Sequence, residues 1–281
     1  MTEHKTFRAG IVQMRSGTDV TANLKAASDL IREAAAKGAQ YVQTPENTLI
    51  MELSRKRMMS DEVNAELNNA YAALGELAAE LEIWLHIGAS AIRRDDGMMS
   101  NRSQLIGPNG HIATIYDKIH MFDADLENGE QYRESNTYHP GDEAVSFSLP
   151  WGRLGLTICY DLRFPALFRA LAQKGADFIA VPAAFTQHTG EAHWHILLRA
   201  RAIETGCYIL AAGQGGLHDV GRSTFGHSLV VSPWGEVIAE AHGVETCVIL
   251  ADIDSGQVQT ARTNIPSLSH DRPFCVGTKK N

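Results

Sequence analysis

The sequence has few positive charges and no long apolar run. Lys and Arg total 25 against 33 Asp and Glu, a formal net charge of −8, and no run of five basic residues occurs. Electrostatic capture of a nucleic acid is therefore not expected. The longest apolar stretches, such as residues 178–185, are about eight residues with a proline inside, whereas a membrane-spanning helix needs roughly 20. We expect neither a nucleic-acid partner nor a membrane segment.

Cysteine is also scarce, and a secretion signal is lacking. The N-terminus opens with charged residues and has no long apolar core of a signal peptide, which predicts a cytoplasmic protein. The four cysteines lie 48, 40 and 28 residues apart, which fits neither a disulfide framework nor a CxxC zinc pattern. We expect free thiols. Cys207, Cys247 and Cys275 have no matching partners and are interpreted as structural.

Apolar residues make up 44% of the 281 residues, enough for a large core, and their periodicity predicts alternating strands and helices. Residues 121–141 show no clear period and predict a long ordered loop of functional importance. No linker divides the chain, so we expect one domain over 1–281 with a C-terminal tail from about 262.

The predicted strands are 7–14, 40–44, 83–89, 144–149, 153–158, 177–181, 207–212, 226–232, 236–241 and 247–253, with a hairpin over 103–116 and helices over 21–37, 61–82, 165–174 and 191–205. This order fits an α/β fold with mixed sheets, either two packed sheets flanked by helices or one doubly wound sheet.

Three reactive side chains fall where predicted strands end: Glu46, Lys118 and Cys159. In α/β sheets, binding crevices form at the carboxyl ends of strands, so these groups can converge. Each also has a plain structural interpretation. Glu46 fits an acid at a helix N-terminus, Lys118 a solvated loop lysine and Cys159 a core thiol.

Six ordered segments make the chain resemble the nitrilase-like carbon–nitrogen hydrolases, from Phe7 to about Phe274. The segments are Pro45-Glu46, 116–123 (YDKIHMFD), 132–135 (YRES), 159–165 (CYDLRFP), 189–194 (TGEAHW), and 226–228 (GHS) with 233–235 (PWG). The resemblance implies a four-layer α-β-β-α sandwich that pairs through its helical face into at least a dimer. It also implies a Glu46-Lys118-Cys159 triad, with Glu134 as the accessory glutamate.

The chemistry of amide hydrolysis suits these residue types. An amide carbonyl is a poor electrophile and ammonia a poor leaving group, so the reaction needs a nucleophile, a proton shuttle and a positive group at the oxyanion. The resemblance implies that Glu46 takes the Cys159 proton and later protonates departing ammonia. Lys118 and the backbone N–H near Tyr160 hold the oxyanion, and water cleaves the thioester. No metal or organic cofactor is needed.

Histidines raise the competing possibility of a metal site, because His188, His193 and His195 cluster in the sequence. Their spacings of five and two do not give the i, i+4 face of an HExxH helix, so we expect no metal site. His193 and Trp194 are interpreted as packing or lining the pocket wall.

The expected substrate is a small linear amide that bears a carboxylate. Arg163 and Thr189, the latter at a predicted helix N-terminus, would suit an anion, and Tyr160 is the third candidate substrate-binding residue. Arg163 could instead pair with Asp161 or a loop acid. Residues 199–208 and 211–218 resemble the branch of deaminated glutathione amidases, with omega-amidases as near neighbours. Hydrolysis of an N-carbamoyl group and acyl transfer by the cysteine stay open as alternatives. Nothing in the sequence specifically resembles the nitrile-hydrolysing branch, and the presence of all three triad residues argues against ligand binding without catalysis.

Overall fold

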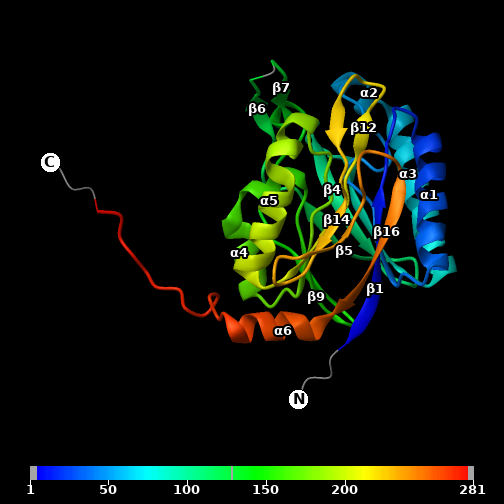
Figure 1. Cartoon of the computed structure of the whole chain (residues 1–281). Coiled ribbons are helices and arrows are strands. Elements are labelled where there is room, and N and C mark those ends of the chain that lie inside the picture. Colours follow the sequence, from blue (N-terminus) through cyan, green and yellow to red (C-terminus); the bar gives the residue numbers. More distant parts are fainter. Residues whose placement is uncertain (1–4, 128, 278–281) are drawn as a thin grey trace.

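The computed structural model describes residues 5–127 and 129–277, which form two six-stranded sheets and flanking helices (Figure 1). The first sheet has the strand order β16-β1-β2-β3-β4-β5. Its β1, β2 and β3 are parallel, and the others pair antiparallel. The strands are β1 (Thr6–Gln13), β2 (Tyr41–Gln43), β3 (Trp84–Arg93), β4 (Met99–Ile106), β5 (Ile112–Asp117) and β16 (Cys247–Asp254).

The second sheet has the order β15-β14-β11-β10-β9-β8, with β9, β10 and β11 parallel. The strands are β8 (Ser146–Leu149), β9 (Gly152–Leu156), β10 (Phe178–Ala180), β11 (Tyr208–Ala211), β14 (Leu229–Val231) and β15 (Val237–Glu240). In both sheets the parallel strands are central and nearly all buried, as expected for strands covered on both faces.

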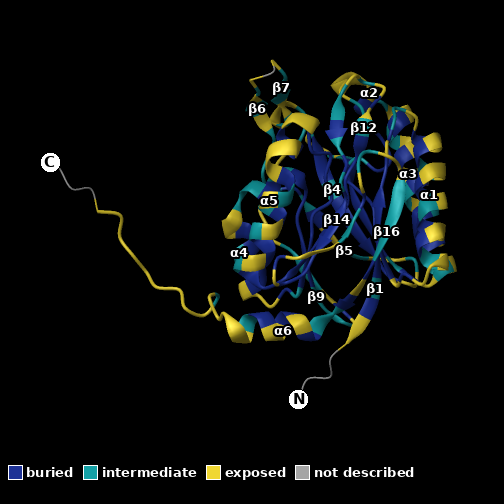
Figure 2. Cartoon of the chain, in the orientation of Figure 1, coloured by how far each residue is buried: buried dark blue, intermediate teal, exposed yellow. Residues whose placement is uncertain are grey.

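The two sheets pack face to face and are covered outside by helices. The Phe7 ring of the first sheet lies edge-on to Phe178 of the second at 5.1 Å, and the Gln43 side chain donates to the Leu210 carbonyl at 3.0 Å. The helices α1 (Val20–Ala36) and α3 (Asp61–Leu81) cover the first sheet, and α4 (Pro165–Gln173) and α5 (Gln187–Thr205) the second (Figure 1). Figure 2 shows their outer faces exposed and the strands between them buried. The predicted four-layer α-β-β-α sandwich is confirmed, and the single doubly wound sheet is excluded.

Two local predictions were wrong. Helix α5 begins at Gln187, four residues before the predicted start at Glu191, because the Thr186 hydroxyl caps it by accepting the Thr189 N–H. The predicted loop 121–141 contains the hairpin β6 (Asp123–Asp125) and β7 (Gln131–Arg133) and a 3₁₀ turn at Glu134–Asn136. These strands are short and mostly exposed, so they lack the alternation of apolar and polar residues from which a strand can be predicted.

Near the C-terminus, helix α6 (Ser255–Asn264) lies across one end of the sandwich (Figure 1). Residues 265–277 form no helix or strand. Their first part is tied to α4, where Arg169 pairs with Asp271, and the rest extends away from the body. None of the helices within 5–127 and 129–277 is long and apolar enough to cross a membrane.

Candidate active site

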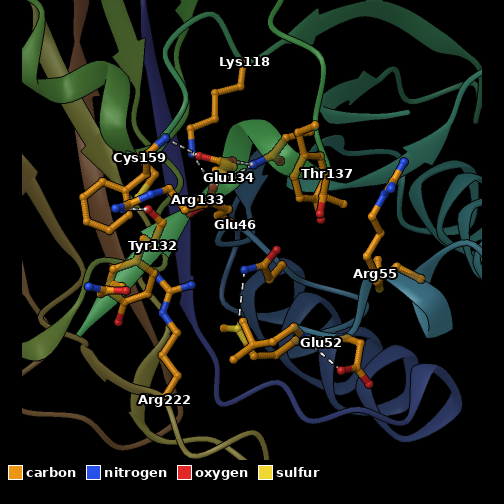
Figure 3. A pocket seen from close by; sticks show the side chains of 18 residues that line it. Glu46, Glu52, Arg55, Lys118, Tyr132, Arg133, Glu134, Thr137, Cys159 and Arg222 are labelled. Atoms are coloured by element: carbon orange, nitrogen blue, oxygen red, sulfur yellow. Dashed lines mark hydrogen bonds and ion pairs between the residues drawn. The ribbon is translucent and has the colours of Figure 1, made fainter. Parts of the chain in front are cut away.

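Glu46, Lys118 and Cys159 line one cavity of about 300 Å³ (Figure 3). Glu46 follows β2 and forms a parallel bridge with Ala89 of β3. Lys118 is the first residue after β5 of the same sheet, whereas Cys159 comes three residues after β9 of the second sheet. The site therefore lies where ends of strands from both sheets meet.

Lys118 is the centre of a buried ionic cluster. Its ammonium donates to Glu46 Oε1 at 3.0 Å and to Glu134 Oε1 and Oε2 at 2.9 and 2.8 Å. The lysine side chain is 2% exposed. A buried charge is tolerated only when it is paired and hydrogen-bonded, and here two carboxylates serve one ammonium. Glu134 is held in turn by the Phe122 N–H, which donates to Oε2 at 2.7 Å.

Asn101, on β4, joins the two carboxylates. Its Nδ2 donates to Glu46 Oε1 at 2.9 Å and to Glu134 Oε1 at 3.0 Å. The Ala184 N–H donates to the second Glu46 oxygen at 2.9 Å. Glu46 is thus fixed from both sheets, and Asn101 is a site residue that the sequence analysis missed. An asparagine inside a strand gives no periodic or motif signal by which it could be found.

Burial and charge act in opposite directions on this cluster. Burial by itself would raise the pKa of Glu46, but the charge of Lys118 and hydrogen bonds from Cys159 and Asn101 outweigh it and lower that pKa. Burial would likewise lower the pKa of Lys118, but Glu134 and Glu46 raise it well above its ordinary value. The resting pair is therefore ionised, carboxylate beside ammonium.

Cys159 opens a five-residue 3₁₀ turn in a left-handed backbone conformation, with φ of 48°. Such a φ is uncommon for a residue other than glycine and is held here by the surroundings. The Cys159 N–H donates to the Pro182 carbonyl at 2.9 Å, and the thiol hydrogen-bonds Glu46. Burial, and then the negative charge of Glu46, raise the pKa of the thiol. The thiol therefore rests protonated, beside a carboxylate that can accept its proton.

The turn is fixed by the fully buried carboxylate of Asp161. It accepts the Ile158 N–H at 2.9 Å, the Tyr116 hydroxyl at 2.7 Å and both the N–H and the ring Nδ1 of His120. Tyr116 and His120 flank Lys118 in sequence. Asp161 thus ties the segment that bears the ammonium to the turn that bears the thiol.

The three predicted substrate-binding residues line a second, smaller cleft, which shares Phe122, Cys159 and Arg222 with the larger cavity. Tyr160, Arg163 and Thr189 lie there, in a space of about 10 Å³. None of them lines the larger cavity. Glu46, Lys118 and Glu134 line only the larger cavity.

Arg163 does not form the ion pair with Asp161 that the sequence left open, because His120 and Tyr116 occupy that carboxylate. No acidic partner among the described residues pairs with Arg163. Its guanidinium lies over the Phe185 ring at 5.1 Å and contacts His193 Nδ1 at 3.3 Å. His193 is thus an exposed neighbour of the cleft.

Arg222 is a second site residue that the sequence analysis missed. It lines both cavities, lies over the Tyr132 ring at 5.3 Å and donates to the Ala184 carbonyl (Figure 3). It has no carboxylate partner in the described chain. It lies 63 residues beyond Cys159, in the segment just before β13 (Ser223–Phe225), and no local pattern links it to the nucleophile.

Of the histidines that cluster in sequence, His188 and His193 join no group of metal-ligand type among the described residues. His195 instead lies with His227 and Glu240, whose ligand-type atoms are within 4.8 Å of one another, the one such group found in the described residues. His195 Nε2 and His227 Nδ1 lie 2.8 and 3.0 Å from the same Glu240 oxygen. Two hydrogen bonds account for this arrangement, and none of the three residues lines either cavity beside Cys159.

Known proteins share both the sequence and the fold over nearly the entire chain. The deaminated glutathione amidase of Yersinia enterocolitica is 39% identical over 274 residues, covering 95% of this chain and 94% of the relative. The omega-amidase NIT2 of Bos taurus is 36% identical, covering 95% of each. The crystal structure of the C. elegans NitFhit protein superposes with a TM-score of 0.89 at 36% identity, covering 95% of this chain. This chain spans 65% of the NitFhit chain.

The sandwich and its similarity to solved structures define the class of nitrilase-fold proteins. The model of the carbon-nitrogen hydrolase family matches residues 8–263. The chain belongs to this family and is a hydrolase that acts on carbon–nitrogen bonds, as the resemblance implied.

Proposed function

We propose that this protein is a cysteine-dependent amidase that cleaves a linear amide of a small carboxylate-bearing substrate, with deaminated glutathione as the first candidate. The observation that carries the proposal is the contact of one buried carboxylate, Glu46, with both the Cys159 thiol and the Lys118 ammonium. The relatives named deaminated glutathione amidase support the choice of substrate.

In the first half of the reaction, Glu46 accepts the thiol proton as the Cys159 sulfur attacks the amide carbonyl. The carbonyl oxygen becomes an oxyanion, which the Lys118 ammonium and the backbone N–H of Tyr160 stabilise. Glu134 and Asn101 hold Lys118 and Glu46 in place for this step. The raised pKa of the thiol and the lowered pKa of Glu46 oppose this transfer in the resting site, so the proton moves along the existing hydrogen bond only as the sulfur–carbon bond forms.

In the second half, protonated Glu46 gives its proton to the departing nitrogen, the C–N bond breaks and a thioester forms on Cys159. A primary amide releases ammonia, and a secondary amide such as that of deaminated glutathione releases the corresponding amine. Glu46, again a carboxylate, then takes a proton from water, whose oxygen attacks the thioester. The C–S bond then breaks, the acid is released, and the departing sulfur takes the proton back from Glu46, which restores the thiol.

The side chains of the smaller cleft suit the carboxylate of the acyl group, although its space of about 10 Å³ must widen to admit one. Arg163 and Arg222 line it and form no ion pair with a carboxylate among the described residues, and Thr189 lies in the first turn of α5, where the helix dipole favours an anion. Tyr160 forms its wall.

A second candidate is omega-amidase activity on alpha-ketoglutaramate, because a relative with that name is 36% identical over nearly the same length. The two substrates carry the same 2-oxoglutaryl acyl group and differ in the amine that leaves. The same triad and the same cleft would serve both.

The test is release of 2-oxoglutarate from both substrates by the wild type and by Cys159→Ala. We expect turnover with deaminated glutathione in the wild type, none in the variant, and no change after treatment with a metal chelator. The matched control is Cys207→Ala, which removes another buried thiol away from both cavities and should retain turnover. Turnover retained in Cys159→Ala would refute the mechanism.

We further propose a cytoplasmic homodimer or larger homo-oligomer. The outer face of α5 and the β14–β15 hairpin expose Ile196, Ile203, Trp234 and Ile238, each 43 to 69% accessible. Such apolar residues on adjoining elements suit a self-complementary interface. Sedimentation of the wild type and of Ile203→Asp tests it, since the charge should shift the protein toward monomer. Cell fractionation tests the location.

A further inference from the structure

The position of Glu46 sets the direction in which a substrate lies across Cys159. Under the proposed function, Glu46 protonates the departing nitrogen, so that nitrogen must come within hydrogen-bond reach of its carboxylate. Glu46 lines the larger cavity and not the smaller cleft, whereas Cys159 lines both. The leaving amine therefore lies on the side of the larger cavity, and the acyl chain points from Cys159 toward the cleft, whose space of about 10 Å³ must widen to admit its carboxylate.

The larger cavity has far more room than ammonia requires. Its volume is about 300 Å³, the lower end of the range for sites that bind small organic molecules. Ammonia is about the size of water and needs only a small part of that space. Met51 and Met58, both buried, line the cavity together with exposed Leu53, so part of its wall is apolar. Such a wall suits an amine with its own side chain.

Two arginines of this cavity, Arg55 and Arg222, pair with no carboxylate among the described residues, and of these only Arg55 lies outside the smaller cleft. Arg133 is paired with Asp125 at 2.7 Å, and Glu52 with Arg57 at 2.9 Å. Arg55, in the short helix α2 (Arg55–Met58), donates to the Gly97 carbonyl at 3.1 Å but to no carboxylate of the described chain. Figure 3 shows it across the cavity from Cys159. A guanidinium in this place can take a carboxylate at the far end of a leaving group.

We propose that the larger cavity is a leaving-group site that selects a short peptide amine ending in a carboxylate, with Met51 and Met58 against its side chain and Arg55 on the carboxylate. This inference rests on the proposed function and makes it more specific. It assigns the chain to secondary amides with a peptide leaving group, of which deaminated glutathione is one, over primary amides that release ammonia.

The two candidate substrates test this directly, because they share the acyl group and differ only in the leaving amine. The measurement is the ratio of kcat/KM for deaminated glutathione to kcat/KM for alpha-ketoglutaramate. We expect a ratio well above one in the wild type, and a fall of about tenfold in Arg55→Ala, from the loss of a hydrogen bond to a charged group. The control is Lys56→Ala, the next residue of α2, which is exposed and outside the cavity, and it should keep the wild-type ratio.

A second measurement uses the wild type alone. Cysteinylglycine, the amine released from deaminated glutathione, should inhibit as a product, and its C-terminal amide should inhibit about tenfold less, because it lacks the carboxylate. An unchanged substrate ratio in Arg55→Ala, or equal inhibition by the two amines, would overturn the leaving-group site while the amidase function stands. Absence of turnover on both substrates in the wild type would overturn the proposed function, and this inference with it.

Discussion

The hydroxyl of Tyr116 donates to the buried carboxylate of Asp161 at 2.7 Å, across 45 residues of chain. Tyr116 precedes Lys118 by two residues, and Asp161 follows Cys159 by two. The bond therefore sets the distance between the ammonium and the thiol, although neither residue lines a cavity beside Cys159.

Removing this bond should affect both stability and turnover. Tyr116→Phe leaves the Asp161 carboxylate without one of its donors, and we expect a loss of about 1–3 kcal/mol in the free energy of unfolding. It should also lower kcat, because Lys118 and Cys159 lose a common support. Urea unfolding and steady-state kinetics measure the two effects. Tyr208→Phe is the control, since its hydroxyl accepts only a 3.4 Å bond from the Asp254 N–H; an equal loss in both variants would contradict the prediction.

Glu134→Gln should lower kcat by about 100-fold, with little change in fold. The carboxylate holds the Lys118 ammonium through both oxygens, and the neutral amide can keep only part of this geometry. The matched control is Glu127→Gln, an exposed acidic residue of the adjoining β6–β7 hairpin that lies outside both cavities. Comparable loss in the two variants would show that the hairpin, and not Glu134, is responsible.

Glu46→Gln should lower the pKa of the Cys159 thiol. Burial raises that pKa in both proteins, and the negative charge of Glu46 raises it further in the wild type only. The variant should therefore form more thiolate at a given alkaline pH while losing turnover. Ultraviolet absorbance of the thiolate, with Cys159→Ala as the blank, follows the titration. A thiol pKa that is equal or higher in the variant would disprove this account.

His86 should make the fold less stable in mild acid. Its imidazole is fully buried beside Tyr41 and Ser103, and burial lowers its pKa from 6.5 to about 3. The unfolded chain binds this proton below about pH 6.5 and the folded chain does not, so stability falls as the pH decreases from 6.5 toward 3. At about pH 5 the loss from this group is about 2 kcal/mol. Urea unfolding at both ends of this interval should show a smaller pH dependence in His86→Gln, and an unchanged dependence would exclude His86 as the cause.

The larger part of the candidate site could be predicted from the rule that binding crevices form at the carboxyl ends of strands in α/β sheets. This rule needs only the order of the elements and the chemistry of the residue types. It placed Glu46, Lys118 and Cys159 at converging ends, and the structure brings these three side chains into contact. Asn101 could not be found in this way, since it lies within a strand and meets its partners only after β4 pairs with β3 and β5. Arg222 reaches the site through tertiary packing alone.

Fold prediction had a similar limit. Periodicity shows which residues of a strand are buried, but a central strand of one doubly wound sheet and a strand of two packed sheets are both buried on two faces. Contacts such as Phe7 with Phe178 decide between the two, and they join residues 171 positions apart. Short exposed strands such as β6 cannot be predicted from periodicity either, because they have no buried row of apolar residues.

The pairing of β1 with β16 has a consequence for the synthesis of the protein. These strands lie side by side in the first sheet over eight residue pairs, from Thr6 with Asp254 to Gln13 with Cys247. β16 begins 234 positions after β1 ends, so a ribosome releases it much later, and this edge of β1 stays unpaired in the meantime. The first sheet is therefore completed only after β16 has emerged, and a nascent chain stalled before β16 would present that edge to other proteins.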